Sequence, residues 1–546
     1  MKQIGFKNFR KFADFPPLDL APITILVGEN NAGKSTVVKG ILAFSDFLNE
    51  CQNYDDEKYF FRYGSNSERK RILKERLKNV KFNFNTSYLA HIGTFKRALY
   101  NKATDESITF QSNLGLMDVT VQVIGKREDE EAVSGNVSMI KLYFDLFKMS
   151  FSFDLMSDIA SVTFNPCPNY NADGYADRYV DGYGYRSRYD MSNKGLKEYF
   201  ASFTKPYTVT TRISDNWSPY RSELIGSLLE ALETSINATL YPFTEDTIEK
   251  SHWVRLPGNP YYATPINDMD DATKAFLRFF AENILQEGIS GSTVPNRFRL
   301  PGTRGPMMRM VDIEYLYAHA VSQTVIYSAK DTNDYLSRTI HEFASQQRYS
   351  YKKDFIIKWM KEFGIGTDFS IRSVGGEAHI VYITNKDGEI VNLADKGMGS
   401  IQLMILFFRL AITLPQKDDR NIVRRIPFNG KIIIIEEPEQ NLHPMLQSKL
   451  ADFFYELNTI YGFRFIIETH SEYLVRSSQV IVGENFNTNE KLKKNPFKVY
   501  YFPSEGVPYD MVYTTSGLFE KKFGGGFINE AGKLHMAVLK NAQKQK

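Results

Sequence analysis

The chain has 546 residues, of which 42% are hydrophobic, and its formal net charge at pH 7 is +3. This length exceeds that of a single small domain, and the nearly balanced charge gives no global basic signature for nucleic acid, although local patches are not excluded. Two cysteines, Cys51 and Cys167, imply no disulfide framework and fit a reducing compartment. No apolar run reaches the roughly 18–20 residues that a membrane span needs, and the N-terminus starts as a strand rather than as a signal peptide. We therefore expect a cytoplasmic protein without a membrane partner.

The first informative segment is a glycine-containing loop near the N-terminus. Residues 28–35 read GENNAGKS, which fits the phosphate-loop pattern G-x-x-x-x-G-K-[ST] in full. The loop follows an apolar run at residues 23–27 and precedes a helical pattern at residues 36–48. Its glycines let backbone N–H groups face an anion, and the positive end of the following helix points to the same place. We predict that Lys34 reaches the β- and γ-phosphates of a nucleotide and that the Ser35 hydroxyl binds Mg²⁺.

The region after this loop contains no further motif of this kind for about 300 residues. Residues 65–79 form a basic stretch typical of a helix, and strand-like runs follow at residues 82–123 and 141–153. We expect these segments to complete an antiparallel β part of the first lobe. The basic run at residues 67–81 is most simply a solvated helix face, with nucleic-acid binding as the alternative.

Residues 168–189 combine Tyr, Gly, Asp and Arg without a hydrophobic period, which indicates a loop. Such a loop could stack on nucleic-acid bases, present a protein-binding surface or have no partner, and its aspartates weaken the first interpretation. Helical patterns follow at residues 223–238, 270–286, 313–323 and 334–363. We expect these helices to form a lid or an arm that binds a partner, and the lack of sustained heptads argues against a long coiled coil.

Two adjacent acids mark the end of a second buried strand. Residues 431–435 contain a β-branched run, which ends in Glu436 and Glu437. The first acid can hold the Mg²⁺ shell, and the second can orient and deprotonate an attacking water. Paired acids are often only the solvated end of a strand, but here a phosphate loop exists to receive them. A third strand, residues 464–468, leads into His470, which is then placed to contact a γ-phosphate or the water.

The order of these motifs resembles the ABC-type ATPase domain and, more narrowly, the overcoming-lysogenization-defect (OLD)-like ATPases of bacterial antiphage systems. The segments that carry the resemblance are IGFKNFRKF, GENNAGKST, LADKGMGSIQLMILF, IIIIEEPEQNLHPMLQ and IIETHSEYLVR. The resemblance implies an α/β fold with an ABC-type (P-loop) ATPase core and a mixed sheet, split by a long, mainly helical insertion. We expect an N-terminal lobe at residues 1–160, the insertion at 161–372 and a C-terminal lobe at 373–546.

The resemblance also implies roles for single residues. Those expected to hold ATP are Arg10, Gly28, Asn30, Asn31, Ala32, Gly33, Lys34, Ser35 and Thr36. Mg²⁺ is assigned to Ser35 and Glu436, the general base is Glu437, and His470 is the switch histidine.

Two more segments resemble parts that act across a dimer. A signature loop, which would close over the partner's γ-phosphate, comprises Lys396, Gly397, Met398, Gly399 and Ser400. It departs from the common Leu-Ser-Gly-Gly form, but it opens a helical pattern at residues 400–412 whose N–H groups can bind an anion. A D-loop after the base comprises Asn441, Leu442 and His443. Because one chain carries one set of motifs, we expect a homodimer or a higher, even-numbered oligomer with ATP at the interface.

The last part of the chain bears on the choice of partner. Residues 471–546 contain no Asp-x-Asp, offer too little length for the Toprim nuclease domain of OLD-like nucleases, and have a single histidine, His535. Residues 524–541 instead resemble the closing helix of stand-alone ATPases of this family. The chain thus resembles the ATPase subunits of Septu systems, including those attached to retrons, with the PARIS ATPase subunit as the runner-up.

We therefore expect an ATPase without nuclease activity that holds a separately encoded nuclease effector inactive until a phage trigger arrives. Direct binding of DNA or of retron RNA–DNA through the basic or Tyr/Arg-rich segments stays open. Two alternatives are a DNA-repair or recombination ATPase that acts on DNA ends and a nucleotide-bound scaffold that does not hydrolyse. The absence of a long coiled coil argues against the first alternative, and the intact acids and His470 argue against the second.

Overall fold

In the computed structural model the chain forms two compact units. The described residues are 1–51, 66–85, 92–114, 118–144, 148–165, 206–215, 224, 228, 241–242, 253–255, 262–265, 313–317, 327–328, 335–345, 350–375, 378–414, 432–524, 527 and 533–538. The first unit comprises Met1–Asp19 and Ser35–Asp312, and the second unit comprises Leu20–Lys34 and Ile313–Lys546.

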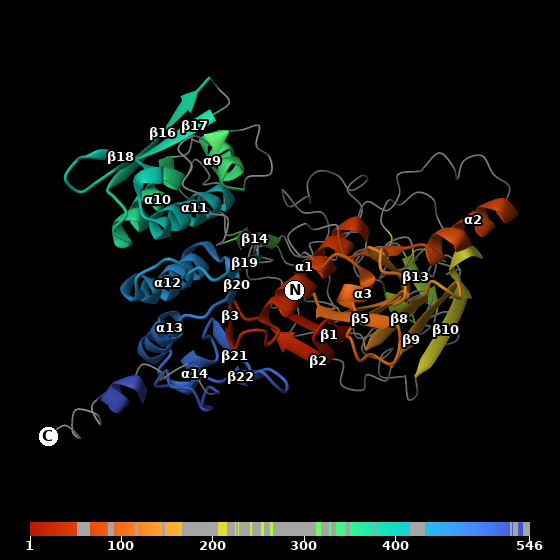
Figure 1. Cartoon of the computed structure of the whole chain (residues 1–546). Helices are drawn as coiled ribbons and strands as arrows, with labels where there is room; N and C mark the ends of the chain where they lie inside the picture. Colours follow the sequence, from red (N-terminus) through yellow and green to blue (C-terminus); the bar gives the residue numbers. More distant parts are fainter. Residues whose placement is uncertain are drawn as a thin grey trace. The chain divides into compact units, whose positions relative to one another are not determined.

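An antiparallel sheet of nine strands forms the framework of the first unit (Figure 1). Its order is β10-β9-β8-β7-β6-β5-β1-β2, and β4 pairs with β7. The bounds are β1 Gln3–Phe9, β2 Phe12–Asp19, β4 Lys81–Asn83, β5 Ser107–Asn113, β6 Asp118–Ile124, β7 Ser134–Phe144, β8 Met149–Asp154, β9 Ile159–Phe164 and β10 Tyr207–Arg212. In β6, buried and partly exposed residues alternate, as is typical of a strand with one face in the core. Val119, Val121 and Val123 are buried, while the residues between them are partly exposed. The strand-like runs expected at residues 82–123 and 141–153 overlap β4, β5, β6, β8 and the end of β7, and the first run also contains the short helix α3 (Phe95–Ala98). Residues 134–140 of β7 lie between the two expected runs.

Helix α1 (Lys34–Glu50) packs on this sheet through aromatic side chains. The Phe44 and Phe110 rings stack with centroids 5.8 Å apart, and the Phe47 and Phe82 rings stack at 5.0 Å. A Cβ atom on Gly40 would lie 2.4 Å from the Phe6 ring, so a larger residue there would push the helix away from β1. Each aromatic pair stabilises the packing by about 0.5–1.5 kcal/mol in addition to the effect of burying its apolar surface. Together these pairs hold α1, the helix that was expected at residues 36–48, on the sheet.

The basic stretch expected to be helical forms α2 (Asn66–Lys78). Leu73 and Leu77 are buried, whereas two of its lysines pair with acids of the same unit: Lys70 Nζ lies 3.0 Å from Asp215, and Lys74 Nζ lies 3.4 Å from Asp158. These lysines therefore already serve the first unit, which favours the solvated-face interpretation over a nucleic-acid surface. Three short strands of this unit, β11 (Tyr241–Pro242), β12 (Trp253–Arg255) and β13 (Tyr262–Pro265), form a separate sheet.

A six-stranded sheet lies at the centre of the second unit, in the order β14-β19-β20-β3-β21-β22. The bounds are β3 Ile23–Gly28, β14 Ile313–Tyr317, β19 Ile432–Glu436, β20 Arg464–Glu468, β21 Phe497–Phe502 and β22 Tyr509–Met511. All neighbours run parallel except β22, which is antiparallel to β21. Continuous apolar runs such as Ile432–Ile435 are buried along their whole length, as expected for parallel strands covered on both faces.

The helix expected at residues 313–323 is a wrong prediction over its first part. Residues 313–317 form β14, which pairs in parallel with β19 from Ile313↔Ile432 to Tyr317↔Glu436. A run of five aromatic and β-branched residues is too short to distinguish the helical from the strand period. These residues form a strand because they pair with the edge of β19. Because β14 belongs to the second sheet, the second compact unit resumes at Ile313. The lobe and insertion boundaries expected at residues 160 and 372 stay a prediction.

The second unit also contains helices and a second, small sheet (Figure 1). Their bounds are α9 Tyr335–Ser345, α10 Ser350–Glu362, α11 Met398–Thr413, α12 Pro444–Glu456, α13 Glu472–Asn485 and α14 Asn489–Leu492. The small sheet consists of β15 Tyr327–Ser328, β16 Asp368–Val374, β17 Ala378–Thr384 and β18 Ile390–Asn392. The helical patterns at residues 334–363 and 400–412 are thus confirmed as α9 with α10 and as α11.

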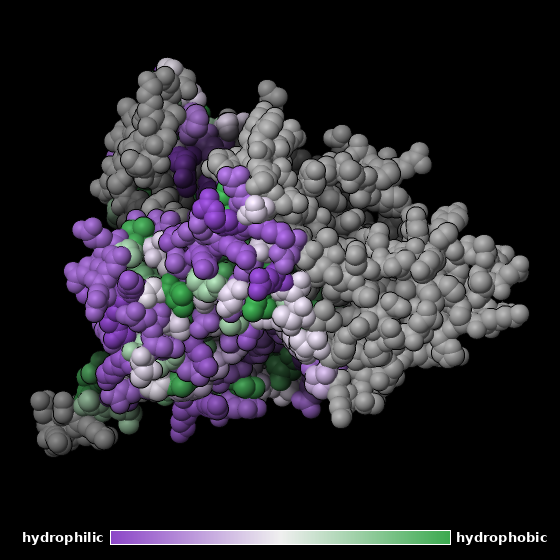
Figure 2. Space-filling view, turned by 90° about the vertical axis from the view of Figure 1, so that its right-hand side faces the viewer, coloured by the Kyte–Doolittle hydropathy of each residue, from purple (hydrophilic) through white to green (hydrophobic). Residues whose placement is uncertain are grey.

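Some sequence expectations fall outside the described residues. They include the Tyr-rich loop at 168–189, the helical pattern at 270–286 and all of the pattern at 223–238 except Leu224 and Leu228. None of the helices in the described part of the chain is long and apolar enough to span a membrane. Figure 2 shows that hydrophilic residues predominate on the described part of one face, with hydrophobic residues scattered among them. Such scattered residues are ordinary on a protein surface.

Candidate functional site

Three neighbouring parallel strands of the second unit end at the same edge of the sheet. Glu436, the last residue of β19, is in register with Glu468 of β20, and Glu468 is in register with Leu26 of β3. The residues that follow these strands therefore meet at one place: the glycine-rich loop after β3, the acidic turn after β19 and the segment Thr469–Ser471 after β20. Sites in open α/β sheets characteristically form at the carboxyl ends of the strands.

The glycine-rich loop has the backbone conformation that its sequence predicts. Gly28 has φ 139° and Gly33 has φ 106°, values that residues with a side chain rarely adopt. A Cβ atom on Gly28 would lie 2.1 Å from the Phe502 carbonyl oxygen of β21, so only glycine fits there. Of the residues between them, Asn30 and Asn31 are exposed, and Ala32 is buried with its N–H donating to the Glu29 carbonyl at 3.3 Å.

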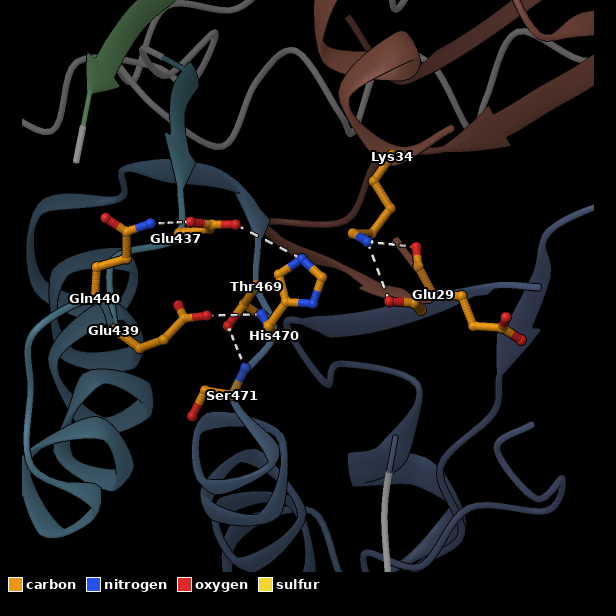
Figure 3. Close-up of polar contacts among 9 residues, drawn as sticks. Glu29, Lys34, Glu437, Glu439, Gln440, Thr469, His470 and Ser471 are labelled. Carbon is orange, nitrogen blue, oxygen red and sulfur yellow. Dashed lines mark hydrogen bonds and ion pairs between the residues drawn. The ribbon is translucent and has the colours of Figure 1, made fainter. Parts of the chain in front are cut away.

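Lys34 begins α1 and is almost fully buried, with a relative exposure of 3%. Its Nζ donates hydrogen bonds to the carbonyl oxygens of Gly28 at 3.1 Å and Glu29 at 2.9 Å (Figure 3). Burial lowers the Lys34 pKa, and the carboxylates of Glu468, Glu437 and Glu439 oppose that shift. The ammonium group is thus held by the loop that precedes it and faces three acids. Ser35 and Thr36 follow in the first turn of α1.

Glu437 stands in the turn after β19 with φ 49°, in the left-handed region. Its N–H donates to the Glu468 carbonyl at 2.7 Å, which anchors the turn to β20. One carboxylate oxygen accepts a hydrogen bond from Gln440, and the other lies 3.6 Å from His470 Nε2 (Figure 3). A left-handed conformation at a non-glycine residue costs of the order of 1–3 kcal/mol and is found mostly where a site demands it. Glu436, directly before it, is half-buried.

His470 follows β20 and combines partial exposure with a lowered pKa. Burial is the largest cause of the lower pKa, the charge of Lys34 adds to it, and Glu437 opposes it. This shift favours the neutral imidazole, which can both donate and accept a hydrogen bond. The structure thus brings Lys34, Glu437 and His470 together, as the sequence predicts for three motifs that are far apart in the chain.

Glu439 is a further acid of this site that the sequence motifs did not place among the catalytic or metal-binding residues, except as a substitute for Glu437. It is buried, and its Oε1 accepts the His470 backbone N–H at 2.6 Å (Figure 3). Burial is the main reason that its pKa is raised. Glu468, the second such acid, is also buried. The repeated acids of EEPE and the acid ending RFIIE are visible in the sequence. The pairing of β19, β20 and β3 brings them to one edge of the sheet, where Glu468, Glu437 and Glu439 influence the pKa of Lys34.

Segment Thr469–Ser471 is tied to the neighbouring helices by polar side chains. Thr469 Oγ1 accepts the Ser471 N–H at 3.0 Å, and Ser471 Oγ accepts the Leu474 N–H at 3.2 Å, which caps α13. Ser471 also donates to Gln447 Oε1 at 2.7 Å, and Gln447 Nε2 donates to the Leu442 carbonyl at 3.0 Å. Gln447 therefore links the histidine segment to the expected D-loop.

The expected D-loop residues have clear roles within their own chain. Asn441 is exposed and has φ 58°, Leu442 is buried, and His443 caps α12 by accepting the Met445 N–H at 3.3 Å. Pro444 at the first helical position completes this helix start. The expected contact of these residues with a second protomer stays a prediction.

The expected signature loop opens α11 beside the D-loop of the same chain. Gly397 is the exposed N-cap, and a Cβ atom on Gly399 would lie 2.4 Å from the Asn441 carbonyl oxygen. Met398 and Ser400 are half-buried in the first turn. Lys396 has its ammonium group turned inward, where it donates to the Ile365 carbonyl at 3.0 Å and to Asn385. Its charge is therefore engaged within the second unit.

Arg10 lies in the first unit, in the turn between β1 and β2. It has φ 51°, and its N–H donates to the Ala98 carbonyl at 2.7 Å. Burial, and then the charge of Arg97, lower its pKa. The phosphate loop up to Lys34 belongs to the second unit, so the expected contact of Arg10 with a nucleotide stays a prediction.

The residues assigned to Mg²⁺ have suitable chemistry. Mg²⁺ takes oxygen ligands and is commonly held by one or two protein groups together with substrate phosphates. The Ser35 hydroxyl and the Glu436 carboxylate are such oxygen donors, and the left-handed turn after Glu436 keeps that carboxylate at the end of β19. In the described residues, no group of three or more His, Cys, Asp and Glu side chains is arranged to hold a metal by itself.

Comparisons with known proteins agree with the ATPase part of these expectations. The sequence profile of a family described as AAA ATPase domain matches residues 1–222 and 270–475. A comparison with curated proteins gives no significant match.

Solved structures similar to the chain include three Smc head domains. The one from Pyrococcus furiosus has 9% sequence identity, covers 98% of this chain and 98% of its own, and gives a TM-score of 0.30. The one from Thermotoga maritima has 7% identity, covers 93% and 98%, and gives 0.29. The one from Pyrococcus yayanosii has 10% identity, covers 94% and 97%, and gives 0.33. At these TM-scores the likenesses support no conclusion about function or assembly.

Proposed function

We propose, from the premise that the chain belongs to the AAA ATPase domain family, that it binds and hydrolyses ATP at the carboxyl edge of strands β3, β19 and β20. The observation that carries the proposal is the convergence of Glu437 and His470, 3.6 Å apart, beside the buried Lys34. A carboxylate next to a neutral imidazole and a phosphate-binding lysine suits the activation of water for phosphoryl transfer.

The loop after β3 supplies the nucleotide-binding groups in this proposal. Lys34 would exchange the carbonyl oxygens of Gly28 and Glu29 for β- and γ-phosphate oxygens, which are stronger acceptors because they are charged. Further contacts with the nucleotide would come from Gly28, Asn30, Asn31, Ala32, Gly33, Ser35 and Thr36. Arg10 is kept as an additional nucleotide contact.

Ser35 and Glu436 would hold Mg²⁺, which when bound neutralises charge on the β- and γ-phosphate oxygens. Glu437 would accept the proton of the attacking water, because its turn presents a carboxylate oxygen toward His470. The lowered pKa of His470 keeps the imidazole neutral, so that it can hydrogen-bond to the water or to the γ-phosphate.

We further propose that two copies of the chain complete each other's sites. The exposed Gly397 N-cap and the first turn of α11 leave backbone N–H groups available to an anion, as the expected signature loop requires. Residues 396–400 and 441–443 would then act on the nucleotide of the second protomer. The inward-turned Lys396 makes the backbone of this loop, and not the lysine charge, the contacting group. A twofold contact of this kind gives a dimer or an even-numbered oligomer.

The cellular role that we propose is regulation of a separately encoded nuclease in an antiphage complex. Its support is the resemblance of GENNAGKST, IIIIEEPEQNLHP and THSEYLVR to OLD-like defence ATPases. Action on DNA ends in repair or recombination is the alternative. Purified alone, the chain should cleave neither DNA nor RNA, and it should form a stable complex with the product of a neighbouring nuclease gene. Magnesium-dependent cleavage by the single chain, abolished in Glu437→Gln, would contradict this division of labour.

The central test of the ATPase proposal is Glu437→Gln. The amide keeps the shape of the side chain but cannot accept a proton at neutral pH, so steady-state hydrolysis should fall about 10²–10⁴-fold while ATP still binds. Glu456→Gln is the matched control, because it removes a carboxylate at the last residue of α12, where Glu456 pairs with Lys358 of α10. Near-normal hydrolysis by Glu437→Gln would show that another group, with Glu436 and Glu439 the nearest candidates, is the base.

A further inference from the structure

The turn that carries Glu437 is held in an unusual shape from its own chain. Glu437 and Asn441 both have positive φ, 49° and 58°. For an L residue this conformation costs roughly 1–2 kcal/mol, with asparagine more tolerant than glutamate. Two backbone hydrogen bonds close the turn, from the Gln440 N–H to the Glu437 carbonyl and from the Leu442 N–H to the Glu439 carbonyl, each 3.1 Å long. The carbonyl oxygen of Glu437 has a second partner, and it comes from another element.

That partner is Gln402, in the second turn of α11. Its Nε2 donates to the carbonyl oxygens of Pro438 at 3.3 Å and Glu437 at 3.5 Å, and its Oε1 accepts from Asn441 Nδ2 at 3.3 Å. One amide thus bridges both left-handed residues of the turn. These bonds are at the long end of the usual range, so a small shift of α11 strengthens or breaks them.

Gln402 is the single polar residue in the run Ile401–Phe408, and it is 6% exposed. Burying an amide among apolar side chains is unfavourable unless it is hydrogen-bonded, and a leucine would satisfy the packing of α11 alone. One turn earlier, Gly399 touches the Asn441 carbonyl so closely that no Cβ atom fits. The first two turns of α11 and the turn of Glu437 are therefore in contact at two points, one steric and one polar.

We propose that Gln402 is a positioning residue for Glu437, which ties the start of α11 to the acidic turn so that the position of the 396–400 loop sets the orientation of the base. The inference rests on the proposed function of Glu437. It adds a coupling between the exposed loop at Gly397 and Glu437. A ligand that moves or fixes this loop, such as the phosphates of a second protomer's nucleotide, changes the orientation of Glu437 through the Gln402 amide.

The test is Gln402→Met, which keeps the length of the side chain and removes all three hydrogen bonds. We expect kcat for ATP hydrolysis to fall tenfold to about a hundredfold, the range that a misplacement of about 1 Å can cause. KM for ATP should stay within about threefold, because the groups that hold the nucleotide are untouched. Gln479→Met is the matched control: Gln479 on α13 also donates its amide to a carbonyl, that of Gly517 at 3.0 Å, and this change should leave kcat unaltered.

The double variant Gln402→Met/Glu437→Gln separates positioning from a general structural effect. If Gln402 acts through Glu437, the double variant should hydrolyse ATP as slowly as Glu437→Gln alone. An equal fractional loss in both backgrounds, or an unchanged kcat in Gln402→Met, overturns the inference while Glu437→Gln still reports on the ATPase proposal. Should Gln402→Met not fold, Asn441→Asp at the exposed end of the bridge removes one of the bonds. It should lower kcat by a smaller factor, and an unaltered kcat overturns the inference.

Discussion

Asp158 in the first unit and Glu439 in the second are both buried carboxylates, with exposures of 5% and 7%, but their surroundings differ. Asp158 also has positive φ, and both of its oxygens are used: Oδ1 accepts the Ser214 N–H at 2.9 Å, and Oδ2 accepts the Ser214 hydroxyl and lies 3.4 Å from Lys74. Glu439 uses Oε1 for the His470 N–H, whereas its buried Oε2 has no hydrogen-bond partner among the described residues.

This difference distinguishes the Asp158 carboxylate, which stabilises the fold, from the Glu439 carboxylate, which belongs to the candidate nucleotide site. The interactions of Asp158 join β9 to the segment after β10 and to α2, and each of its atoms is satisfied within the first unit. Glu439 lies among Lys34, Glu437 and His470, where an incompletely satisfied acid persists because the surrounding structure holds it there. Substitution of buried polar side chains in the first unit should therefore lower stability. Substitution of buried polar side chains at the carboxyl edge of the six-stranded sheet should instead impair ligand binding and catalysis.

The largest expected effect is that of Lys34→Ala on ATP binding. Losing one charged donor to two phosphates removes about 3 kcal/mol, which corresponds to an affinity loss of at least about a hundredfold. Titration with a fluorescent ATP analogue measures the affinity.

The second unit offers a matched control for this change. Lys352 is likewise buried at 4% exposure, its pKa is lowered mainly by burial, and its Nζ donates to the Ile412 carbonyl at 3.0 Å. Lys352→Ala should bind ATP as well as the wild type does. If Lys34→Ala also retained full affinity, the assignment of the whole nucleotide site would be wrong.

Asp158→Ala should show the opposite pattern. It leaves the Ser214 N–H and hydroxyl buried without an acceptor and places alanine at a positive φ, so the free energy of unfolding should fall by about 2–3 kcal/mol. Asp158→Asn keeps an acceptor and tolerates the backbone conformation, and it should lose no more than about 1 kcal/mol. Urea denaturation measures both variants. A loss of ATP affinity in the folded Asp158→Ala protein would break the distinction between the two units.

Much of this site could be predicted from the sequence because its parts are contiguous motifs at strand ends. GENNAGKS fixes the loop of Lys34, and the apolar runs before Glu436 and before His470 mark the two strands that end beside it. In a parallel sheet all such ends lie at one edge, so strand identity alone brings Lys34, Glu437 and His470 together. The ATPase family and the α/β fold followed from the same motifs.

The remainder depends on contacts between segments that are distant in sequence. Gln402 gave a weak signal as one polar residue in an apolar helix, but its partners lie on a turn 35 residues later. The inward turn of Lys396 depends on Asn385 and Ile365, which no local pattern connects to it. Strand β14 was expected to be helical, because a five-residue aromatic run does not determine its own period and pairing with β19 does.

The smallest expected effect, and the finest test of the site, is the pH dependence that His470 contributes to stability. Burial and Lys34 lower its pKa in the folded chain, so the unfolded chain, with a pKa of about 6.5, binds the proton first as the pH falls. The folded state is therefore relatively destabilised as the pH drops from about 6.5 toward the folded pKa, and the contribution is constant above that window. His470→Gln removes this dependence.

Urea denaturation of wild type and His470→Gln at a series of pH values measures the difference. His379, whose pKa is lowered by burial and by His341, titrates in both proteins and cancels in the comparison. We expect the wild-type free energy of unfolding to decline relative to that of His470→Gln only below about pH 6.5. Parallel curves across this range would show that His470 has the same pKa in both states. That result would contradict the lowered pKa of His470, and with it the neutral imidazole that the ATPase proposal uses beside Glu437.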